Sequence, residues 1–414
     1  MSDRHRLTIV LGVSQLLSWA CTFYVPAVIA GAAAASLGAS RMAVVGGFSW
    51  ALLVAGVCAP RIGRQIDRAG GRPVLAASSL VLAAGLALLA AAHGLGLWYA
   101  GWTVLGLGMA LGLYDAAFAT LGRLLGPEAP PAITGVTLIA GFASSLGWSV
   151  GPLLVAHIGW RGTLLAYAAA QLAVNLPMMA LLVPATPADG AAADRTAADG
   201  TTAREDRAAP AATDAAKGTA GEGMGGAGMG GGRRRILALL SSYFTLRWFI
   251  TSALAVYILP LLRDLGLTQG AAIAAAALIG PGQVAGRMLE WTIGPRISLF
   301  AKARMGAALM PLGVACLLFG GPAGATGFAV LYGMSNGILT INRGTLPLAL
   351  FGPQGYASLL GWLAVPVLLA QASAPTLVAP LIGVLPAGDV FLVAGVLGGV
   401  AGLLLLALRR PHGP

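Results

Sequence analysis

The stretch GRQIDRAGGRPVL, residues 63–75, decides how the rest of the sequence is interpreted. Three arginines and one aspartate stand among these thirteen residues together with three glycines, in a 414-residue chain of which only 9% is charged. Long apolar runs precede and follow the stretch. A basic cluster between two such runs is typical of a short loop that joins two membrane-spanning helices.

The composition indicates a chain whose solvent is lipid. It is 57% hydrophobic with a mean hydropathy of +0.83, whereas about a quarter of the residues of a soluble domain are charged. Apolar runs of about 20 residues, enough to cross a bilayer core of ~30 Å, recur along almost the whole length. The first run, from Leu7, is longer than a signal-peptide core, so we expect a retained helix. The runs lack the alternation of a membrane barrel, which predicts an all-α polytopic membrane protein.

Glycines, prolines and charged residues divide the apolar runs into twelve expected helices. These helices span residues 7–35, 42–60, 73–92, 96–122, 131–155, 162–183, 236–262, 270–289, 300–320, 323–350, 355–380 and 385–408. They form two six-helix halves, residues 1–184 and 236–414. The segment between them, residues 185–235, is rich in Ala, Gly, Asp and Thr and has no aromatic residue, so we expect a disordered linker.

Motifs for metal, cofactor or enzyme chemistry have little support. Met224 and Met229 in the linker are candidate ligands for a soft metal, but low-complexity sequence is the better explanation for them. The three cysteines lie inside apolar runs without zinc spacing. The sequence has no glycine-rich phosphate loop followed by Lys and Ser or Thr, so ATP is not expected to drive the protein directly. We expect no metal, no cofactor and no enzymatic activity.

The distribution of Lys and Arg predicts the orientation. With the N-terminus inside the cell, twenty of these residues fall in cytoplasmic segments, and only Arg41, Arg161 and Arg263 fall in outer loops. This asymmetry predicts that both termini are cytoplasmic. It also explains the net charge of +11 without a nucleic-acid partner. Arg233, Arg234 and Arg235 are expected to anchor the start of the seventh helix at the membrane face.

The opening stretch resembles the signature loop between the second and third helices of the major facilitator superfamily. Its matching residues are Gly63, Asp67, Arg68, Gly70 and Arg72, while a glycine replaces one residue of the family's basic pair. A plain basic loop would require neither the aspartate nor this spacing. The resemblance implies a secondary transporter with twelve helices in two six-helix bundles, related by a parallel pseudo-two-fold repeat. It also implies that this loop latches the cytoplasmic side closed.

Two echoes in the second half support that repeat. GRMLE, residues 286–290, has the spacing of GRQID, so Gly286, Arg287 and Glu290 are expected to contribute to the cytoplasmic gate. GMSNG, residues 333–337, likewise echoes GMALG, residues 108–112. Repeats in register across two halves are the sequence signature of a duplicated transporter fold.

The fifth helix carries a weaker resemblance. Gly147, Gly151 and Pro152 in GWSVGPLL look like the core of the antiporter motif of superfamily exporters, although the motif's later glycine pair is missing. Small residues at four-residue spacing also permit close helix packing, which would explain them without export. The superfamily's usual proton-coupling arginine in the fourth helix would fall near Trp102 and is absent.

Two charges inside expected helices are the leading functional candidates, because lipid penalises unpaired charge. Asp115 shares a helical face with small residues, and Arg343 shares one with Asn336 and Thr340. The repeat register allows the two charges to face each other across a central cavity. Asp115 is then a candidate proton carrier, and Arg343 a candidate grip for an anion. The alternatives are a structural ion pair for Asp115 and snorkelling of Arg343 towards the membrane surface.

Other polar and aromatic side chains in apolar surroundings are candidate substrate contacts. They are Tyr114, Gln15, Trp19, Tyr24, Gln283, Gln371 and Arg247. Hydrogen bonds between helices would account for the glutamines, and snorkelling would account for Arg247.

The sequence therefore predicts a secondary active transporter that moves a small organic or inorganic anion by proton-coupled alternating access. One alternative is an exporter of arsenite or small drugs by proton antiport. Another is a membrane sensor that has kept the fold without transport. We expect a multi-pass monomer in the inner (plasma) membrane, with a small-molecule substrate, protons and the lipid bilayer as its partners.

Overall fold

The computed structural model describes residues 3–185, 231–293 and 296–408, and almost all of them are helical. The first-half elements are α1 (Asp3–Ala20), α2 (Val25–Leu37), α3 (Arg41–Ala69), α4 (Gly71–Ala90), α5 (Leu95–Gly112), α6 (Tyr114–Leu125), η1 (Gly126–Glu128), α7 (Ala129–Ala140), α8 (Ala143–Ala170), η2 (Gln171–Asn175) and η3 (Met178–Leu182). Those of the second half are α10 (Gly231–Asp264), α11 (Gln269–Ala277), α12 (Ile279–Ile293), α13 (Leu299–Phe351), α14 (Tyr356–Val378), η5 (Ala379–Leu381) and α15 (Ala387–Leu406).

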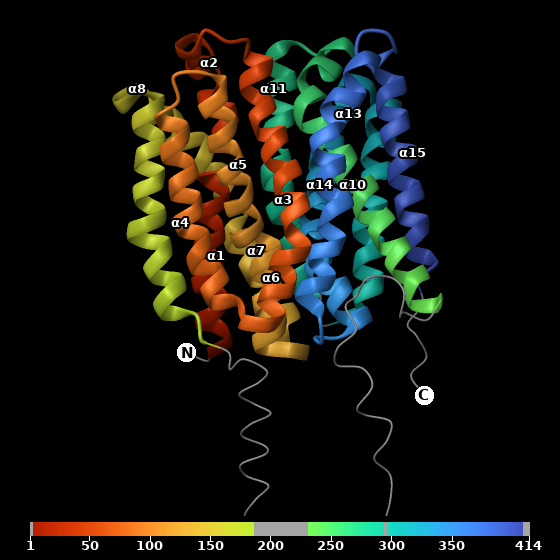
Figure 1. Ribbon diagram of the computed structural model, residues 1–414. Coiled ribbons are helices and arrows are strands. Elements are labelled where there is room, and N and C mark those ends of the chain that lie inside the picture. The colour runs from red at the N-terminus through yellow and green to blue at the C-terminus, as the bar shows by residue number, and fades with distance from the viewer. Residues whose placement is uncertain (1–2, 186–230, 294–295, 409–414) are drawn as a thin grey trace, which may run out of the picture.

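Within these ranges the helices make twelve membrane passages, which confirms the predicted fold class (Figure 1). Ten described stretches are long and apolar enough to span a bilayer. One of them, Leu299–Phe351, holds two passages, and Leu95–Ala140 together with Ser149–Leu182 holds three. α1 begins and α15 ends at the same end of the molecule, which we call the terminal end (Figure 1).

Glycine makes the two tightest reversals, where the helical hydrogen-bonding pattern barely breaks. Gly159 inside α8 has φ 70°, and Gly321 inside α13 has φ 55°. Positive φ is accessible to glycine and strained for other residues. The expected breaks between residues 155 and 162, and between 320 and 323, coincide with these two glycines.

Four passages are interrupted within the membrane, at positions that the sequence did not predict. The first passage breaks between α1 and α2 at residues 21–24, and the fourth breaks at Leu113 between α5 and α6. The fifth breaks at residues 141–142, and the eighth at Leu278. Interrupted backbone is tolerated at membrane depth where it is buried in protein or lines a cavity.

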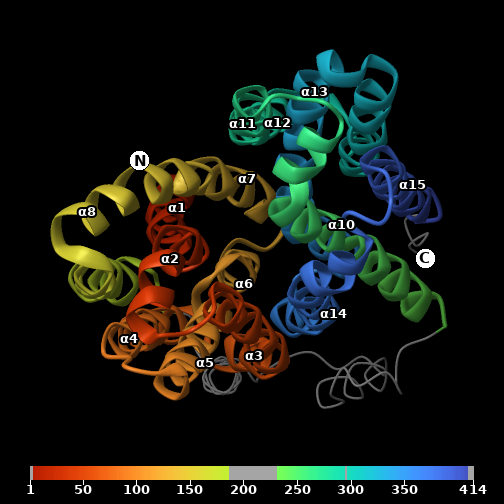
Figure 2. The ribbon, with the colours of Figure 1, turned by 90° about the horizontal axis from the view of Figure 1, so that it is seen from above.

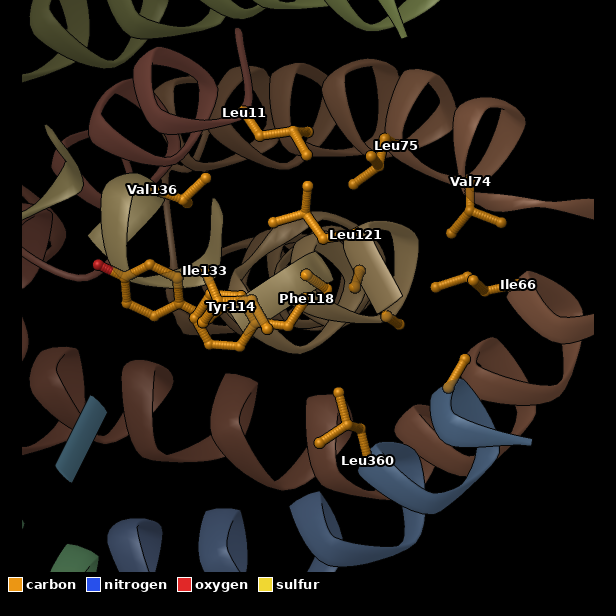
Figure 3. Packing of buried hydrophobic residues seen from close by; sticks show 14 of the residues in the cluster. Leu11, Ile66, Val74, Leu75, Tyr114, Phe118, Leu121, Ile133, Val136 and Leu360 are labelled. Atoms are coloured by element: carbon orange, nitrogen blue, oxygen red, sulfur yellow. The ribbon is translucent and has the colours of Figure 1, made fainter. Parts of the chain in front are cut away.

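The two halves pack side by side (Figure 2). α3 of the first half runs along α14 of the second, and α7 contacts α12 and α13. At the terminal end the two halves share one apolar cluster. Leu360 of α14 reaches the group formed around Phe118, Leu121 and Ile133 (Figure 3). Apolar side chains therefore fill the space between the two halves at the terminal end.

The structure describes only part of the segment expected as linker and only part of the C-terminal end. α10 already begins at Gly231, inside the segment expected as linker, so Arg233 to Arg235 are helical. Residues 186–230, with Met224 and Met229, lie outside the described residues, as do Arg409 and Arg410.

Candidate functional site

A central cavity of about 390 Å³ lies between the two halves. From the first half it is lined by Trp19, Phe23, Tyr24, Val45, Phe48, Ser49, Leu52, Tyr114, Ala140, Gly141 and Ala143. From the second half it is lined by Trp248, Thr251, Ser252, Ala255, Val256, Gln283, Arg287, Asn336, Leu339, Thr340, Gln371 and Pro375. Three of the interrupted passages (the first, fourth and fifth) contribute residues at or beside their breaks.

The first-half wall of the cavity is aromatic. Tyr114 and Trp19 have ring centroids 4.9 Å apart, and Trp19 and Phe23 lie 5.0 Å apart. Phe23 continues the series to Phe48 at 5.0 Å. Offset and edge-on ring contacts at these distances are favourable and fix the rings relative to one another. The wall is therefore a rigid apolar surface.

The second-half wall is polar. Arg287 is buried, with 4% exposure, and Asn336 and Thr340 are buried beside the cavity. Arg287 Nη2 lies 3.5 Å from Gln283 Oε1, while its Nε and Nη1 have no hydrogen-bond partner in the described part of the chain. Arg287 Nη1 packs directly on Gly141 of the opposite half, where a side chain would occupy its place.

Arg247 lies behind this wall and outside the cavity lining. It is fully buried, and its Nη2 donates to Ser335 Oγ at 2.7 Å and to Asn336 Oδ1 at 3.3 Å. An arginine has no acceptor, so the Oδ1 of Asn336 must face it. Thr251 Oγ1 donates to the same oxygen at 3.2 Å.

The side of the cavity nearest the terminal end is closed by a pair of opposite charges. Arg343 Nε and Nη2 each donate to one oxygen of Asp115, both at 2.7 Å. Asp115 stands in the first turn of α6, just after the extended residue Leu113, where the helix dipole also favours its charge. The juxtaposition of these charges that the sequence predicts is present, and it joins the two halves.

Close packing of α13 on α6 brings Arg343 within hydrogen-bonding distance of Asp115. A methyl group at Gly344 would lie 2.8 Å from Phe118 Cδ2, so only a residue without a side chain lets α13 approach α6 so closely. The break before α6 is stabilised by Gln15, whose Nε2 donates to the Gly112 carbonyl at 2.7 Å. Gln15 therefore makes a helix–helix contact and does not line the cavity.

Asp67 forms a second link, at the terminal end. Its carboxylate accepts from the backbone N–H of Ala357 at 3.2 Å and of Ser358 at 2.8 Å, and from the Ser358 hydroxyl at 2.5 Å. A carboxylate of one half thus caps the N-terminus of α14 in the other half, where backbone donors are unsatisfied and the dipole favours negative charge. Arg123 donates to the Asp67 carbonyl.

Glycines let the chains around Asp67 meet. A methyl group at Gly63 would collide with the Ala357 carbonyl. Gly70 has φ 82° at the turn between α3 and α4, which again requires glycine. Arg68 is exposed and Arg72 is partly exposed at this turn.

The second-half echo forms a different contact. Glu290 Oε2 accepts from Thr134 Oγ1 of α7 at 3.1 Å, and Lys302 of its own half lies 2.5 Å from Oε1. Gly286 packs on the backbone of Met334 in its own half. Arg287, which the echo assigns to the gate, lies one turn before Glu290 along α12 and reaches the cavity.

The glycines of the fifth passage pack against the first. A methyl group at Gly147 would lie 2.8 Å from Tyr24 Cβ, and one at Gly151 would lie 3.0 Å from Val28 Cγ2. Pro152 follows within the same helix. Close packing accounts for both glycines.

Sequence reasoning missed several residues of the site. Phe23, Phe48 and Trp248 line the cavity, and Ser358 receives Asp67. The aromatic density of WACTFY, residues 19–24, was a usable signal, because it falls where the first passage breaks. A buried polar group of Asn175, Gln171, Ser18 and Ser79 inside the first half was also missed.

A family model described as Major Facilitator Superfamily matches residues 10–375. The chain belongs to the major facilitator superfamily. This match confirms the resemblance of the 63–75 stretch, and the superfamily consists of transporters. No curated protein sequence matches the chain.

Solved superfamily structures share its fold. The proton:xylose symporter XylE, bound to 6-bromo-6-deoxy-D-glucose, aligns with a TM-score of 0.72 at 13% identity, covering 98% of this chain and 96% of its own. The E. coli fucose:proton symporter FucP aligns at 0.70 and 13% identity, covering 100% of both chains. The human organic anion transporter MFSD10 (TETRAN) aligns at 0.66 and 18% identity, covering 98% of this chain and 100% of its own.

Proposed function

We propose that this superfamily member moves a small anion together with a proton by alternating access. In this proposal both termini lie in the cytoplasm and the chain spans the inner (plasma) membrane, as the Lys and Arg distribution predicts. The observation that carries the proposal is the two-pronged Asp115–Arg343 pair, which joins the two halves beside the central cavity.

The contacts between the halves support a transport cycle. Asp115–Arg343, Asp67 with the start of α14, and Glu290 with Thr134 all lie between the central cavity and the terminal end. The cavity extends away from that end, along α3 to Val45 and along α14 to Pro375. With cytoplasmic termini, this arrangement is the outward-facing state, and opening to the cytoplasm must break all three contacts.

The charges explain why an anion and a proton would move together. Separating Asp115 from Arg343 leaves a carboxylate and a guanidinium without partners in a largely apolar region, which is costly. A proton on Asp115 removes the first charge, and an anion beside Arg343 compensates the second. The halves can then separate at the cytoplasmic side without exposing two unpaired charges to apolar surroundings.

Purified protein in liposomes tests the proposal. An inward pH gradient should drive uptake of an anion such as lactate, phosphate or benzenesulfonate, and protein-free liposomes should show none. Uptake that is independent of the pH gradient would contradict proton coupling. Binding of an anion with a conformational change but without uptake would contradict transport and favour a sensor with the same fold.

A further inference from the structure

Arg287 is the starting point, because its charge is buried and unpaired. Its exposure is 4%, and its Nε and Nη1 lack hydrogen-bond partners in the part of the chain that the structure describes. The nearest carboxylate on its helix, Glu290, is already engaged by Lys302 and Thr134. A guanidinium stays charged in such surroundings, and an unpaired buried charge is expensive for the fold. Arg287 therefore needs a compensating anion from outside the chain.

The other two arginines in the centre of the molecule differ from Arg287 either in their partner or in their place. Arg343 is bound through two nitrogens to Asp115. Arg247 also has an Nε and an Nη1 that no described residue engages, but its Nη2 is held by Ser335 and Asn336 and it does not line the cavity, so an anion in the cavity cannot be assigned to it. Among these three, Arg287 alone lines the larger cavity, with donors that no described residue engages.

Gln283, the hydrogen-bonded neighbour of Arg287, adds a further donor. The Oε1 of Gln283 faces Arg287, which leaves its Nε2 for the cavity. A guanidinium beside an amide donor suits an anionic group with more than one oxygen, and a carboxylate meets a guanidinium in the favoured two-pronged geometry.

The aromatic wall opposite Arg287 determines what the remainder of the bound molecule must be. Tyr114, Trp19, Phe23 and Phe48 form a continuous aromatic series, and Trp248 adds a further ring. Such a surface rewards apolar groups and offers little to an inorganic ion. The volume of about 390 Å³ lies within the roughly 300–1,000 Å³ of typical small-molecule pockets.

We propose that the central cavity binds an organic anion with an apolar body, its carboxylate on Arg287 and its body against the aromatic wall. The inference rests on the proposed function, since it takes this cavity as the transport site. It deepens that proposal by assigning the anion to Arg287 in this state of the protein, in which Arg343 is occupied by Asp115.

Binding to the full-length protein in lipid nanodiscs tests the assignment without a proton gradient. Calorimetry with hexanoate, hexanamide, acetate and inorganic phosphate separates charge from apolar contact. We expect hexanoate to bind at least tenfold more tightly than each of the other three probes. Arg287→Gln should weaken hexanoate binding at least thirtyfold and leave hexanamide unchanged, whereas Arg287→Lys should give an intermediate loss. Arg296→Gln, an exposed arginine outside the cavity lining, is the matched control and should change nothing.

Each outcome either supports or contradicts the assignment of the anion to Arg287. Hexanoate binding that survives in a folded Arg287→Gln protein overturns the assignment. If acetate or phosphate binds as tightly as hexanoate, the proposed contact between an apolar body and the aromatic wall is wrong. If Arg287→Gln does not fold, the hexanoate–hexanamide difference in the unaltered protein and the Arg287→Lys variant still decide. Arg287-dependent binding without pH-driven uptake would leave this inference standing and contradict the proposed function alone.

Discussion

The two halves share a helix order but divide the chemistry of the cavity unequally. The first half supplies Trp19, Phe23 and Phe48, and the second supplies Arg287 and Asn336. The links across the interface are divided in the same way. The first-half carboxylates Asp67 and Asp115 bind backbone donors and an arginine of the second half. A duplicated fold thus keeps its architecture while its two copies take separate roles, one apolar and acidic, the other donor-rich.

That division suits a transporter whose halves must part during the cycle. Contacts made by a few charges can be switched by protonation or by a bound anion, whereas a large apolar interface cannot. The two sides of the cavity can also be altered separately by mutation.

Arg343 makes the strongest charged contact between the two halves. Arg343→Ala leaves Asp115 without its partner, and we expect a loss of up to about 3 kcal/mol in stability, below the full value for a deeply buried pair because Asp115 keeps 26% side-chain exposure. The double variant Asp115→Asn/Arg343→Gln should recover part of the loss. Thermal unfolding in detergent measures both. An equal loss in the double variant would contradict a direct interaction.

Adding a methyl group at Gly63 tests how closely the halves pack at the terminal end. The Ala357 carbonyl occupies that space, so Gly63→Ala should cost about 1–3 kcal/mol by overpacking, and should push α3 away from α14. Gly94→Ala is the matched control, because nothing lies near a methyl group there. Melting temperatures of the two variants report the difference. Equal melting temperatures would mean that α14 moves away from the added methyl group without a loss of stability.

Asp67 and Glu290 each link the two halves at the terminal end, but with different numbers of bonds. Asp67→Asn weakens three bonds across the interface, including two to a helix N-terminus, and should cost about 1–2 kcal/mol. A loss of this size raises the open fraction about 5–30-fold. Glu290→Gln should do less, because only Thr134 lies across the interface and Lys302 belongs to the same half.

Spin labels at residues 128 and 354 can measure both latch variants. These positions are exposed, one in each half at the terminal end. The longer distances should gain population in Asp67→Asn, and less so in Glu290→Gln. An unchanged distribution in Asp67→Asn would exclude a latch role for this carboxylate.

The aromatic wall should give the smallest effect, and one that depends on the probe. Phe23→Ala removes part of the apolar surface, so hexanoate should bind about tenfold more weakly, equivalent to ~1.4 kcal/mol. Acetate binding should not change. Phe319→Ala is the matched control, because that ring is 94% exposed. A similar loss for acetate and hexanoate would mean that the variant disturbs the fold and not the apolar contact.

The sequence carried the architecture and part of the site. The twelve passages, the reversals at Gly159 and Gly321 and the meeting of Asp115 with Arg343 all follow from glycine, charge and repeat spacing. The breaks at residues 21–24 and at Leu113 did not, because tertiary contacts such as Gln15 with Gly112 stabilise them. The place of Arg287 was not predicted either, because the echo of GRQID assigned it to the cytoplasmic gate, whereas it lies one turn before Glu290 on α12 and lines the cavity.

The most direct test of the account uses Asp115→Asn, which holds the side chain permanently neutral. Benzenesulfonate stays charged and crosses lipid poorly, so its movement in liposomes reports the protein. We predict that uptake driven by a pH gradient collapses in Asp115→Asn, while exchange of internal for external benzenesulfonate continues and no proton enters with it. Melting must show that the variant is folded. Retained pH-driven uptake in a folded Asp115→Asn protein would contradict the account.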